Sequence, residues 1–547
     1  MERKWWTLIA VCVAIFMLLL DITVVNVALP SIQSSLKSSF SDLQWVVNAY
    51  ALTLAAFLLT AGSVADLKGR RLVFTLGLVV FTASSAVCGL STTPLMLNLA
   101  RAVQGVGGAM MFSTSLALLA EAFHGRERGT AFGAFGAVTG AAVAIGPVVG
   151  GIITSGIGWE WIFFINVPIG IAAVAITLSR VVESRDPNAK RVDWIGLVTF
   201  SGALFMLVFA LIEGNEDGWG STRIVSLLLG ALVLFVAFVV AELKQSRPML
   251  DLSLFRLPAF TGASIVAFAV SSSIFAMFLY LTLYIQDVLG FTALQAGLRF
   301  LPITLLSFVV APIAGRLSVR MPVRYLLGGG LLLVSAGLLA MTAVSATSGW
   351  TTLIPGFALA GAGVGMINPP LASTAIGVVH HSRSGMASGI NSTFRQVGIA
   401  TGIAGLGAVF QHDVLNTTTK ALGGQLQPVQ AAAHGHLNTL LQSGEVKQVF
   451  HALSPAAQVA LKHSYRVGFT EAFDHILLIA AGIAFVGALL ALALVRQRDF
   501  VASQSGAGEQ ALDLGAAGAQ GPGVGLALDG DAAVLDEAEL AQTHQQL

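Results

Sequence analysis

The sequence predicts an all-α membrane protein, built from two six-helix bundles with two further helices inserted between them. Its composition is the first reason: 55% of the 547 residues are hydrophobic, 10% are charged and the mean hydropathy is +0.82. A soluble globule of this length is less apolar. The number of apolar segments is the second reason, and a repeat between the two halves of the chain is the third. A polytopic membrane protein follows.

A window of about 19 residues, which is the length of a helix that crosses a bilayer, finds fourteen apolar segments. We expect these spans at residues 5–29, 43–64, 72–91, 95–120, 129–154, 161–180, 193–212, 223–243, 260–284, 293–315, 324–345, 351–375, 386–410 and 470–495. An even number of spans places both termini on the same side of the membrane.

A short glycine motif occurs in both halves of the chain. Residues 129–133, Gly-Thr-Ala-Phe-Gly, open span five, and residues 385–389, Gly-Met-Ala-Ser-Gly, open span thirteen. A weaker pair follows spans two and ten, at residues 62–71 and 315–320. In both pairs the second motif follows eight spans after the first, so spans one to six correspond to spans nine to fourteen. Parallel repeats of this kind are one architecture of secondary transporters, which bind substrate between the halves near the midplane.

The repeat also divides the chain into parts. We expect an N-terminal six-helix bundle at 1–180, a linker with the two inserted helices at 181–258, and a C-terminal six-helix bundle at 259–498. The second bundle includes a long outer loop at 411–469. Residues 499–547 are rich in Gly, Ala, Asp and Glu and hold no Lys or Arg, so we expect a disordered cytoplasmic tail.

Charge is distributed unevenly over the connections. Those on one side hold about twenty Lys and Arg and those on the other about six, so the positive-inside rule places both termini in the cytoplasm. The net charge of +1 argues against a nucleic-acid partner. No Gly-x-x-x-x-Gly-Lys loop occurs, so we expect no direct use of ATP. We also predict that the protein is not an enzyme. His434 and His436 in the outer loop are a weak signal alone, and we predict no metal site.

Asp21 is the residue that most needs an explanation. It lies in a first span that carries no other charge from Trp5 onward, where a mid-bilayer acid costs about 2.5–3.5 kcal/mol. Counted from Pro30, Asp21 lies about 13 Å below the outer surface, and Arg101, counted from Pro94, lies about 10 Å below it. These similar depths favour an electrostatic pair. The pair either couples proton movement to transport or only fixes spans one and four together.

Six motifs, in order along the chain, resemble those of a known family. They are Leu20 to Pro30, Gln44 to Tyr50, Gly62 to Arg71, Leu97 to Gly107, Gly140 to Gly151 and Phe163 to Pro168. In these motifs the chain is similar to the fourteen-span drug:proton antiporters of the major facilitator superfamily, and the likeness covers roughly residues 5–498. Glu160 departs from the pattern, because the family commonly has a basic residue between the two tryptophans.

The resemblance implies the major facilitator fold and a monomeric exporter in the plasma membrane. It implies efflux of hydrophobic, cationic or amphiphilic small molecules, such as drugs or antibiotics, driven by the proton gradient without a cofactor. One alternative is a dedicated exporter of a single secondary metabolite, siderophore or lipid. A more distant alternative is a membrane sensor that keeps the fold and transports nothing.

Several groups of residues are candidates for this function. Asp21 and Arg101 are the candidates for proton coupling. The resemblance implies a cytoplasmic gate at Asp66, Lys68, Arg70 and Arg71, although basic residues there also satisfy the positive-inside rule. It also implies an antiporter motif, whose small residues and proline favour close helix contact and a kink. This motif comprises Gly140, Gly146, Pro147, Gly150 and Gly151.

Five residues are candidates to line a substrate cavity. They are Trp45, Asn48, Gln104, Asn391 and Arg395. Arg395 lies ten residues beyond Gly385, or about 15 Å from the cytoplasmic face and so near the midplane. The alternative for its polar side chain is a hydrogen bond between helices. The identity of the substrate does not follow from these residues.

Overall fold

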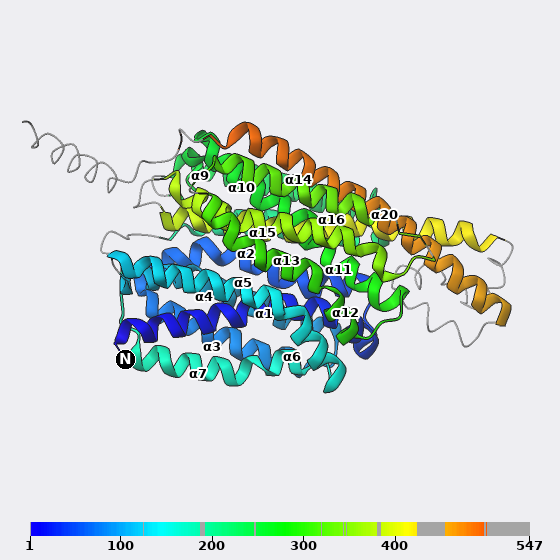
Figure 1. Cartoon of the computed structure of the whole chain (residues 1–547), viewed down its shortest axis with the longest axis horizontal. Coiled ribbons are helices and arrows are strands. Elements are labelled where there is room, and N and C mark those ends of the chain that lie inside the picture. The colour runs from blue at the N-terminus through cyan, green and yellow to red at the C-terminus, as the bar shows by residue number, and fades with distance from the viewer. Residues whose placement is uncertain are drawn as a thin grey trace, which may run out of the picture. The chain divides into compact units, whose positions relative to one another are not determined.

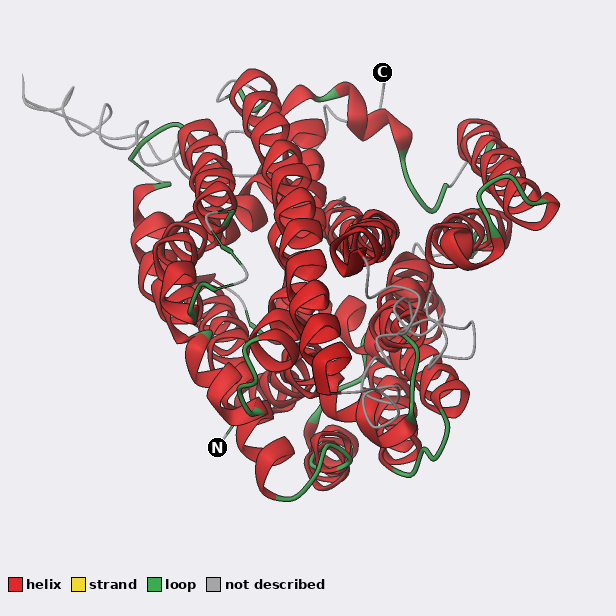
Figure 2. Ribbon diagram, turned by 90° about the vertical axis from the view of Figure 1, so that its right-hand side faces the viewer, coloured by secondary structure: helices red, strands yellow, loops and turns green. Residues whose placement is uncertain are grey.

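The computed structural model describes most of the chain up to residue 499. The described residues are 2–123, 125–185, 192–245, 248–318, 320–342, 344–345, 347–379, 384–423, 455–496 and 499. Their regular segments are all helices, and no strand occurs among them (Figure 2). The expected tail beyond residue 499, and His434 and His436 of the outer loop, lie outside these residues.

Seven helices form the N-terminal bundle. They are α1 (Arg3–Leu36), α2 (Phe40–Lys68), α3 (Arg70–Gly89), α4 (Pro94–Ala122), α5 (Gly125–Gly156), α6 (Trp161–Phe164) and α7 (Asn166–Arg180). Local sequence explains where several begin. Ser39 and Asp42 form a capping box at α2, and the Thr93 hydroxyl caps α4, whose first residue is a proline. Gly69, at φ 127°, makes the sharp junction between α2 and α3.

The two inserted helices are α8 (Trp194–Asp217) and α9 (Thr222–Lys244), which pack on each other. Asp193 caps α8 by accepting from the Gly196 backbone N–H at 2.7 Å, and it also accepts from Gln245 and the backbone of Met249. Burial raises the pKa of Asp193, but these hydrogen bonds lower the pKa by more, so it lies below its usual range. The charged cap therefore ties the insertion to the segment that leads into the second bundle.

The C-terminal bundle begins with a short 3₁₀ helix, η1 (Leu252–Arg256). Its first span is α10 (Pro258–Val270), η2 (Ser271–Phe275), α11 (Ala276–Leu283) and η3 (Tyr284–Val288), where η2 and η3 are π-helical. The others are α12 (Ala293–Arg299), α13 (Leu301–Leu317), α14 (Val323–Met341), the 3₁₀ helix η4 (Trp350–Leu353), α15 (Ile354–Gly377), α16 (Ser384–Leu422) and α20 (Pro455–Leu494).

Helices occur at all fourteen predicted spans, and thirteen in the described part of the chain are long and apolar enough to cross a membrane. The remaining one is α16, in which polar residues such as Asn391 and Arg395 lower the hydropathy. Some predicted boundaries are wrong. The first helix passes through Pro30 and ends at Leu36, so Pro30 does not end it. Helices α16 and α20 both extend into the segment expected to be the long outer loop.

The two bundles lie side by side, with their helices roughly parallel (Figure 1). The halves meet where α2 packs on α16, where α5 packs on α12 and α13, and where α1 packs on α11. Helix α8 contacts both α2 and α16, so the insertion covers one of these seams. We call the end that holds Arg3, Arg70 and Arg180 the basic end, and the other the opposite end.

Candidate functional site

The Asp21 carboxylate lies inside the N-terminal bundle, in contact with α4. Its Oδ2 accepts from Arg101 Nη1 at 2.6 Å, and its Oδ1 accepts from Gln104 Nε2 at 3.0 Å. Asp21 is only 2% exposed and Arg101 only 1%. The depth argument from the sequence therefore identified a real pair. Gln104, a candidate for the substrate cavity, belongs to this cluster instead of standing apart from it.

Asn166 completes the cluster and was not among the predicted site residues. Its Nδ2 lies 3.3 Å from Asp21 Oδ1 and also donates to Ser85 Oγ at 3.0 Å. Ser85 in turn donates to the backbone oxygen of Phe163 at 2.9 Å. Asn166 is the first residue of α7, just after the break that follows α6. The signal that could have found it is an amide side chain in an otherwise apolar segment, because such a group needs a hydrogen-bond partner when it is buried.

The guanidinium of Arg101 is held on several sides. Nε donates to the Val46 backbone oxygen at 3.1 Å, Nη1 donates to Gln104 Oε1 at 2.7 Å, and the group lies 4.3 Å from the centre of the Tyr50 ring. This fixed cation needs the Asp21 carboxylate as its counter-charge. The cluster is thus one buried ion pair, surrounded by the amide groups of Gln104 and Asn166.

The predicted gate residues gather around the junction of α2 and α3. Arg70 contacts Asp66 Oδ1 at 3.0 Å and lies 3.7 Å from Glu121 on α4, while Lys68 is exposed. Arg71 donates through Nη2 to the backbone oxygen of Leu178 at 3.0 Å. All these partners belong to the N-terminal bundle. Among the described residues, the ion pairs at this junction thus stay within one half and do not bridge the two.

Glu183 is a further residue at this junction that the sequence did not reveal. Its carboxylate accepts from the backbone N–H groups of Arg71 at 2.9 Å and Leu72 at 3.1 Å, so it caps the N-terminus of α3. The same carboxyl lies close to Gly69, where an added Cβ would be 2.6 Å from its Cδ. Glu183 follows α7, more than 100 residues away in sequence, and therefore ties two helices together at the basic end.

Glu183→Ala is expected to lower the stability of the folded protein by about 1 kcal/mol, the size of an ordinary N-cap contribution. Glu183→Gln keeps one acceptor oxygen and should lose less. Thermal unfolding of the purified protein in detergent measures both variants, with Glu127→Ala as an exposed control at the same end. Equal unfolding temperatures for Glu183→Ala and the wild type would contradict the capping role.

The other cavity candidates do not meet at one place. Trp45 donates through Nε1 to Glu213 Oε1 at 3.3 Å and packs on two phenylalanines of α8, so it docks the inserted helices. Asn391 donates to the Ala263 backbone oxygen at 3.3 Å and links α16 to α10. Asn48 is fully buried in α2, and its amide atoms have no hydrogen-bond partner in the described part of the chain.

Arg395 lies apart from all of these, inside the C-terminal bundle. Its Nη2 donates to Asn368 Oδ1 on α15 at 2.6 Å, and its guanidinium carbon lies 6.0 Å from the centre of the Phe275 ring. The side chain is half-buried. Of the candidates for proton coupling and for the substrate cavity, the structure therefore joins Asp21, Arg101 and Gln104, and it leaves Arg395 as a separate polar centre.

The predicted antiporter motif forms the contact face of α5. Gly146 packs directly on the Thr23 side chain, and a Cβ at Gly150 would lie 3.0 Å from the Val24 backbone, so both hold α5 against α1. A Cβ at Gly151 would lie 2.7 Å from the backbone of α12 in the other half. Gly140 is less crowded, because its nearest neighbour, Phe308, would be 3.8 Å away.

Near the motif, hydrogen bonds also join the two halves at the opposite end. Gln286 donates to the Val27 backbone oxygen at 2.7 Å, and the Leu294 backbone donates to Ser155 Oγ at 2.9 Å. At the basic end of α5, in contrast, a Cβ at Gly133 would meet nothing within 4 Å. In this conformation the α5 side of the interface is thus sealed at the opposite end.

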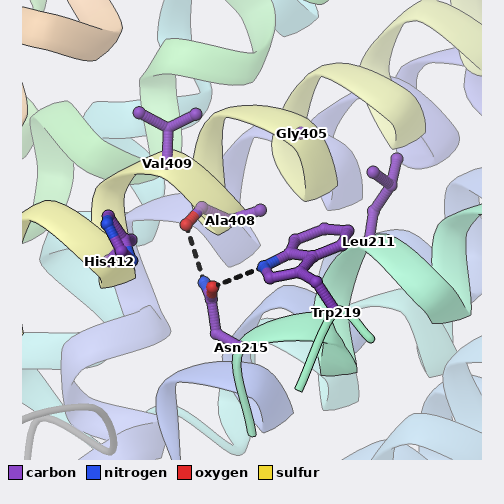
Figure 3. Close-up of a pocket in the computed structure, with 7 residues that line it drawn as sticks. All are labelled: Leu211, Asn215, Trp219, Gly405, Ala408, Val409 and His412. Carbon is purple, nitrogen blue, oxygen red and sulfur yellow. Dashed lines mark hydrogen bonds between the residues drawn. The ribbon is translucent and has the colours of Figure 1, made fainter. Parts of the chain in front are cut away.

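A separate pocket of about 450 Å³ lies between α8 and α16 toward the opposite end (Figure 3). Asn215 crosses it, donating to the Ala408 backbone oxygen at 2.6 Å and accepting from Trp219 Nε1 at 2.9 Å. Free space remains in the pocket beside Gly405, because a Cβ added there would meet no atom within 4 Å. The complete lining is Leu211, Asn215, Trp219, Gly405, Ala408, Val409 and His412. No charged pair lies in it among the described residues.

The chain is similar in sequence to known proteins over most of its length. The sequence model that describes the Major Facilitator Superfamily matches residues 11–403 of this chain. The multidrug resistance protein Stp of Mycobacterium tuberculosis is 38% identical over 404 residues, which cover 74% of this chain and 75% of that protein. The tetracenomycin C resistance and export protein of Streptomyces glaucescens is 34% identical, with 75% and 77% covered.

A third relative and a solved structure extend the likeness to nearly the whole chain. The puromycin resistance protein pur8 of Streptomyces alboniger is 32% identical, over 92% of this chain and 94% of that protein. A bacterial homolog of the human lysosomal transporter Spinster, solved in an inward-facing conformation, matches with a TM-score of 0.55. It covers 91% of this chain and 99% of that one, and at 18% identity it shows the fold alone.

Proposed function

This chain belongs to the major facilitator superfamily, and we propose that it exports hydrophobic or amphiphilic small molecules, such as drugs or antibiotics, in exchange for protons. Relatives named for multidrug or antibiotic resistance support efflux. The observation that carries the proton coupling is the Asp21 cluster, a carboxylate buried inside the membrane-spanning bundle on a buried cation. The exporter acts as a monomer in the plasma membrane with both termini in the cytoplasm, and it needs no cofactor.

In the proposed cycle Asp21 takes up a proton from outside and releases it inside. The carboxylate is closed off from solvent in this conformation, so exchange of its proton with either side requires the helices around it to move. Protonation frees Arg101 from its counter-charge and lowers the cost of that movement. A carboxylate that changes partners in this way couples the proton gradient to the equilibrium between two arrangements of the bundles.

The other predicted residues then have assigned parts. Asp66, Lys68, Arg70 and Arg71 form the gate at the basic end, where the present ion pairs rearrange when that end closes. The glycines of α5 allow the tight seal at the opposite end, which opens when substrate leaves. Substrate binds between these two ends, at the level of the half-buried polar residues of the second bundle.

A second candidate is a dedicated exporter of one secondary metabolite. The names of two relatives support it, because one is described by resistance to and export of tetracenomycin C and the other by resistance to puromycin. The two candidates share a mechanism and differ in the breadth of substrates. A panel of chemically unlike compounds separates them.

The test uses purified full-length protein in liposomes. We expect a proton gradient, acidic on the side that receives substrate, to drive uphill movement of at least one compound of the panel, and nigericin to abolish it by collapsing the gradient. Valinomycin with potassium separates the electrical part of the driving force. Movement that persists unchanged in the presence of nigericin would overturn proton coupling, and movement of no compound under any gradient would overturn export.

A further inference from the structure

Three arginines lie in the interior of predicted spans, away from the first and last residues of those spans, and their surroundings differ. Arg101 is neutralised by Asp21 at 2.6 Å. Arg299, at the end of α12, has its guanidinium 3.5 Å from the centre of the Phe291 ring and 5.1 Å from that of Trp350. Arg395 lies eleven residues from the start of α16, or about 16 Å along it, and so well inside the bundle. Of the three, Arg395 is the deep cation without a matching charge.

The contacts of Arg395 leave its charge uncompensated. Its hydrogen bond goes to the neutral amide of Asn368, and the Phe275 ring at 6.0 Å is at the limit of a cation–π contact. In the part of the chain that the structure describes, no carboxylate lies within ion-pair distance of it. A guanidinium stays protonated in proteins, so it cannot avoid this cost by becoming neutral.

The surroundings of Arg395 resemble a binding site more than a packed helix contact. The side chain is half-buried, so Arg395 is less enclosed than Asp21 and Arg101. Phe275 ends the π-helical segment η2, and such irregular turns occur frequently at functional sites. In the same segment Ser271 is fully buried, its hydroxyl has no hydrogen-bond partner among the described residues, and it packs against Gly398, one turn from Arg395.

We propose that Arg395 binds an acidic group of the exported molecule, so that the substrates are organic anions with an apolar, aromatic body. The planar N–H donors of the guanidinium suit a carboxylate, a sulfonate or a phenolate, and the hydrogen bond to Asn368 holds the guanidinium in place. The Phe275 ring offers a face for the apolar body. This inference rests on the proposed export function and gives it a substrate class, which differs from the cationic class that the sequence alone suggested.

The test compares two fluorescent probes with the same aromatic frame. Anilinonaphthalene sulfonate carries an anionic group, and phenylnaphthylamine lacks it. We expect the purified full-length protein in nanodiscs to bind the sulfonate more tightly, and Arg395→Gln to weaken that binding at least about tenfold, as when a hydrogen bond to a charged group is lost. Binding of the neutral probe should change less than about twofold, within the range of a peripheral contact.

Two control variants keep the result interpretable. Arg395→Lys retains the charge without the planar fork and should lose less affinity than Arg395→Gln. Arg299→Gln removes an arginine at the opposite end and should leave both probes unaffected. Gel filtration of each variant checks folding, and if Arg395→Gln does not fold, the comparison of Arg395→Lys with the wild type decides.

Several results would overturn the proposal. An equal loss for both probes would make Arg395 a clamp between α15 and α16, and no preference of the wild type for the sulfonate would remove the anion site. Displacement of the sulfonate by a few millimolar chloride, with gluconate as the control anion, would assign the guanidinium to a small inorganic ion. The binding result does not depend on a gradient, so absence of the anion preference in a wild-type protein that still shows proton-driven export would overturn this inference alone.

Discussion

Asp21→Asn is expected to abolish uphill export while substrate still moves down its own gradient. The amide has nearly the same shape and still reaches Gln104 and Asn166, but it cannot carry a proton at any pH of interest. It therefore removes the step that links the proton gradient to the movement of the bundles. In liposomes, proton-driven accumulation should fall to the level of empty vesicles, and exchange of labelled for unlabelled substrate should remain.

The same substitution leaves Arg101 buried without a counter-charge, which costs about 3–5 kcal/mol of stability. The double variant with Arg101→Gln removes the unpaired charge and should recover much of that loss, yet it should remain unable to pump. Asp21→Glu keeps an acid and should retain part of the activity. Glu216→Gln, an exposed acid at the opposite end, is the matched control. Normal proton-driven pumping by Asp21→Asn would show that the pair is only structural.

The sequence was sufficient to predict the Asp21 pair because helical rise converts residue number into depth. Two opposite charges at similar depth in two apolar segments have few other partners, so they are expected to pair with each other. The same reasoning took Pro30 as the end of the first helix, whereas the helix continues through Pro30 to Leu36. A proline in a helix removes one hydrogen bond but does not have to end the helix, particularly where membrane and neighbouring helices support it.

The cavity residues were harder to predict, because the depth of a residue along its helix does not say which neighbouring helix its side chain contacts. A span that is apolar on every side has no amphipathic pattern to show which face packs on a neighbour. Trp45 and Asn391 both carry a polar group at a depth that suits a cavity. In the structure, however, Trp45 contacts the inserted helix α8 and Asn391 contacts α10. The capping of α3 by Glu183 was equally hidden, since it depends on a contact between segments more than 100 residues apart.

Gly297→Leu is expected to prevent the sealed conformation from forming at the opposite end. The backbone oxygen of Pro147 lies directly against Gly297, so a side chain there would meet backbone that cannot turn aside. Gly151 faces the same seam from α5, where an added Cβ would lie 2.7 Å from the oxygen of Ala293. Overpacking of such a contact costs about 1–3 kcal/mol, and only separation of α5 from α12 relieves it.

The overpacking cost applies to the arrangement in which the opposite end is sealed, and not to the arrangement in which that end is open. If the sealed state loses about 2 kcal/mol relative to the open one, the ratio of the two populations changes roughly thirtyfold. Export should fall strongly, because a transporter that rarely seals one end cannot complete its cycle. Substrate binding from the open end should remain, so the variant differs from one that is unfolded.

A cysteine pair measures the population directly. Ser155→Cys and Leu294→Cys lie across the seam, where the Leu294 backbone donates to the Ser155 side chain at 2.9 Å. With Cys12 and Cys88 replaced by alanine, the pair should cross-link readily in the parent protein and several times more slowly with Gly297→Leu. Gly133→Leu is the control, because an added Cβ there meets nothing within 4 Å. Unchanged cross-linking in Gly297→Leu would mean that the seam tolerates a side chain, and tight α5 packing would not be what closes this end.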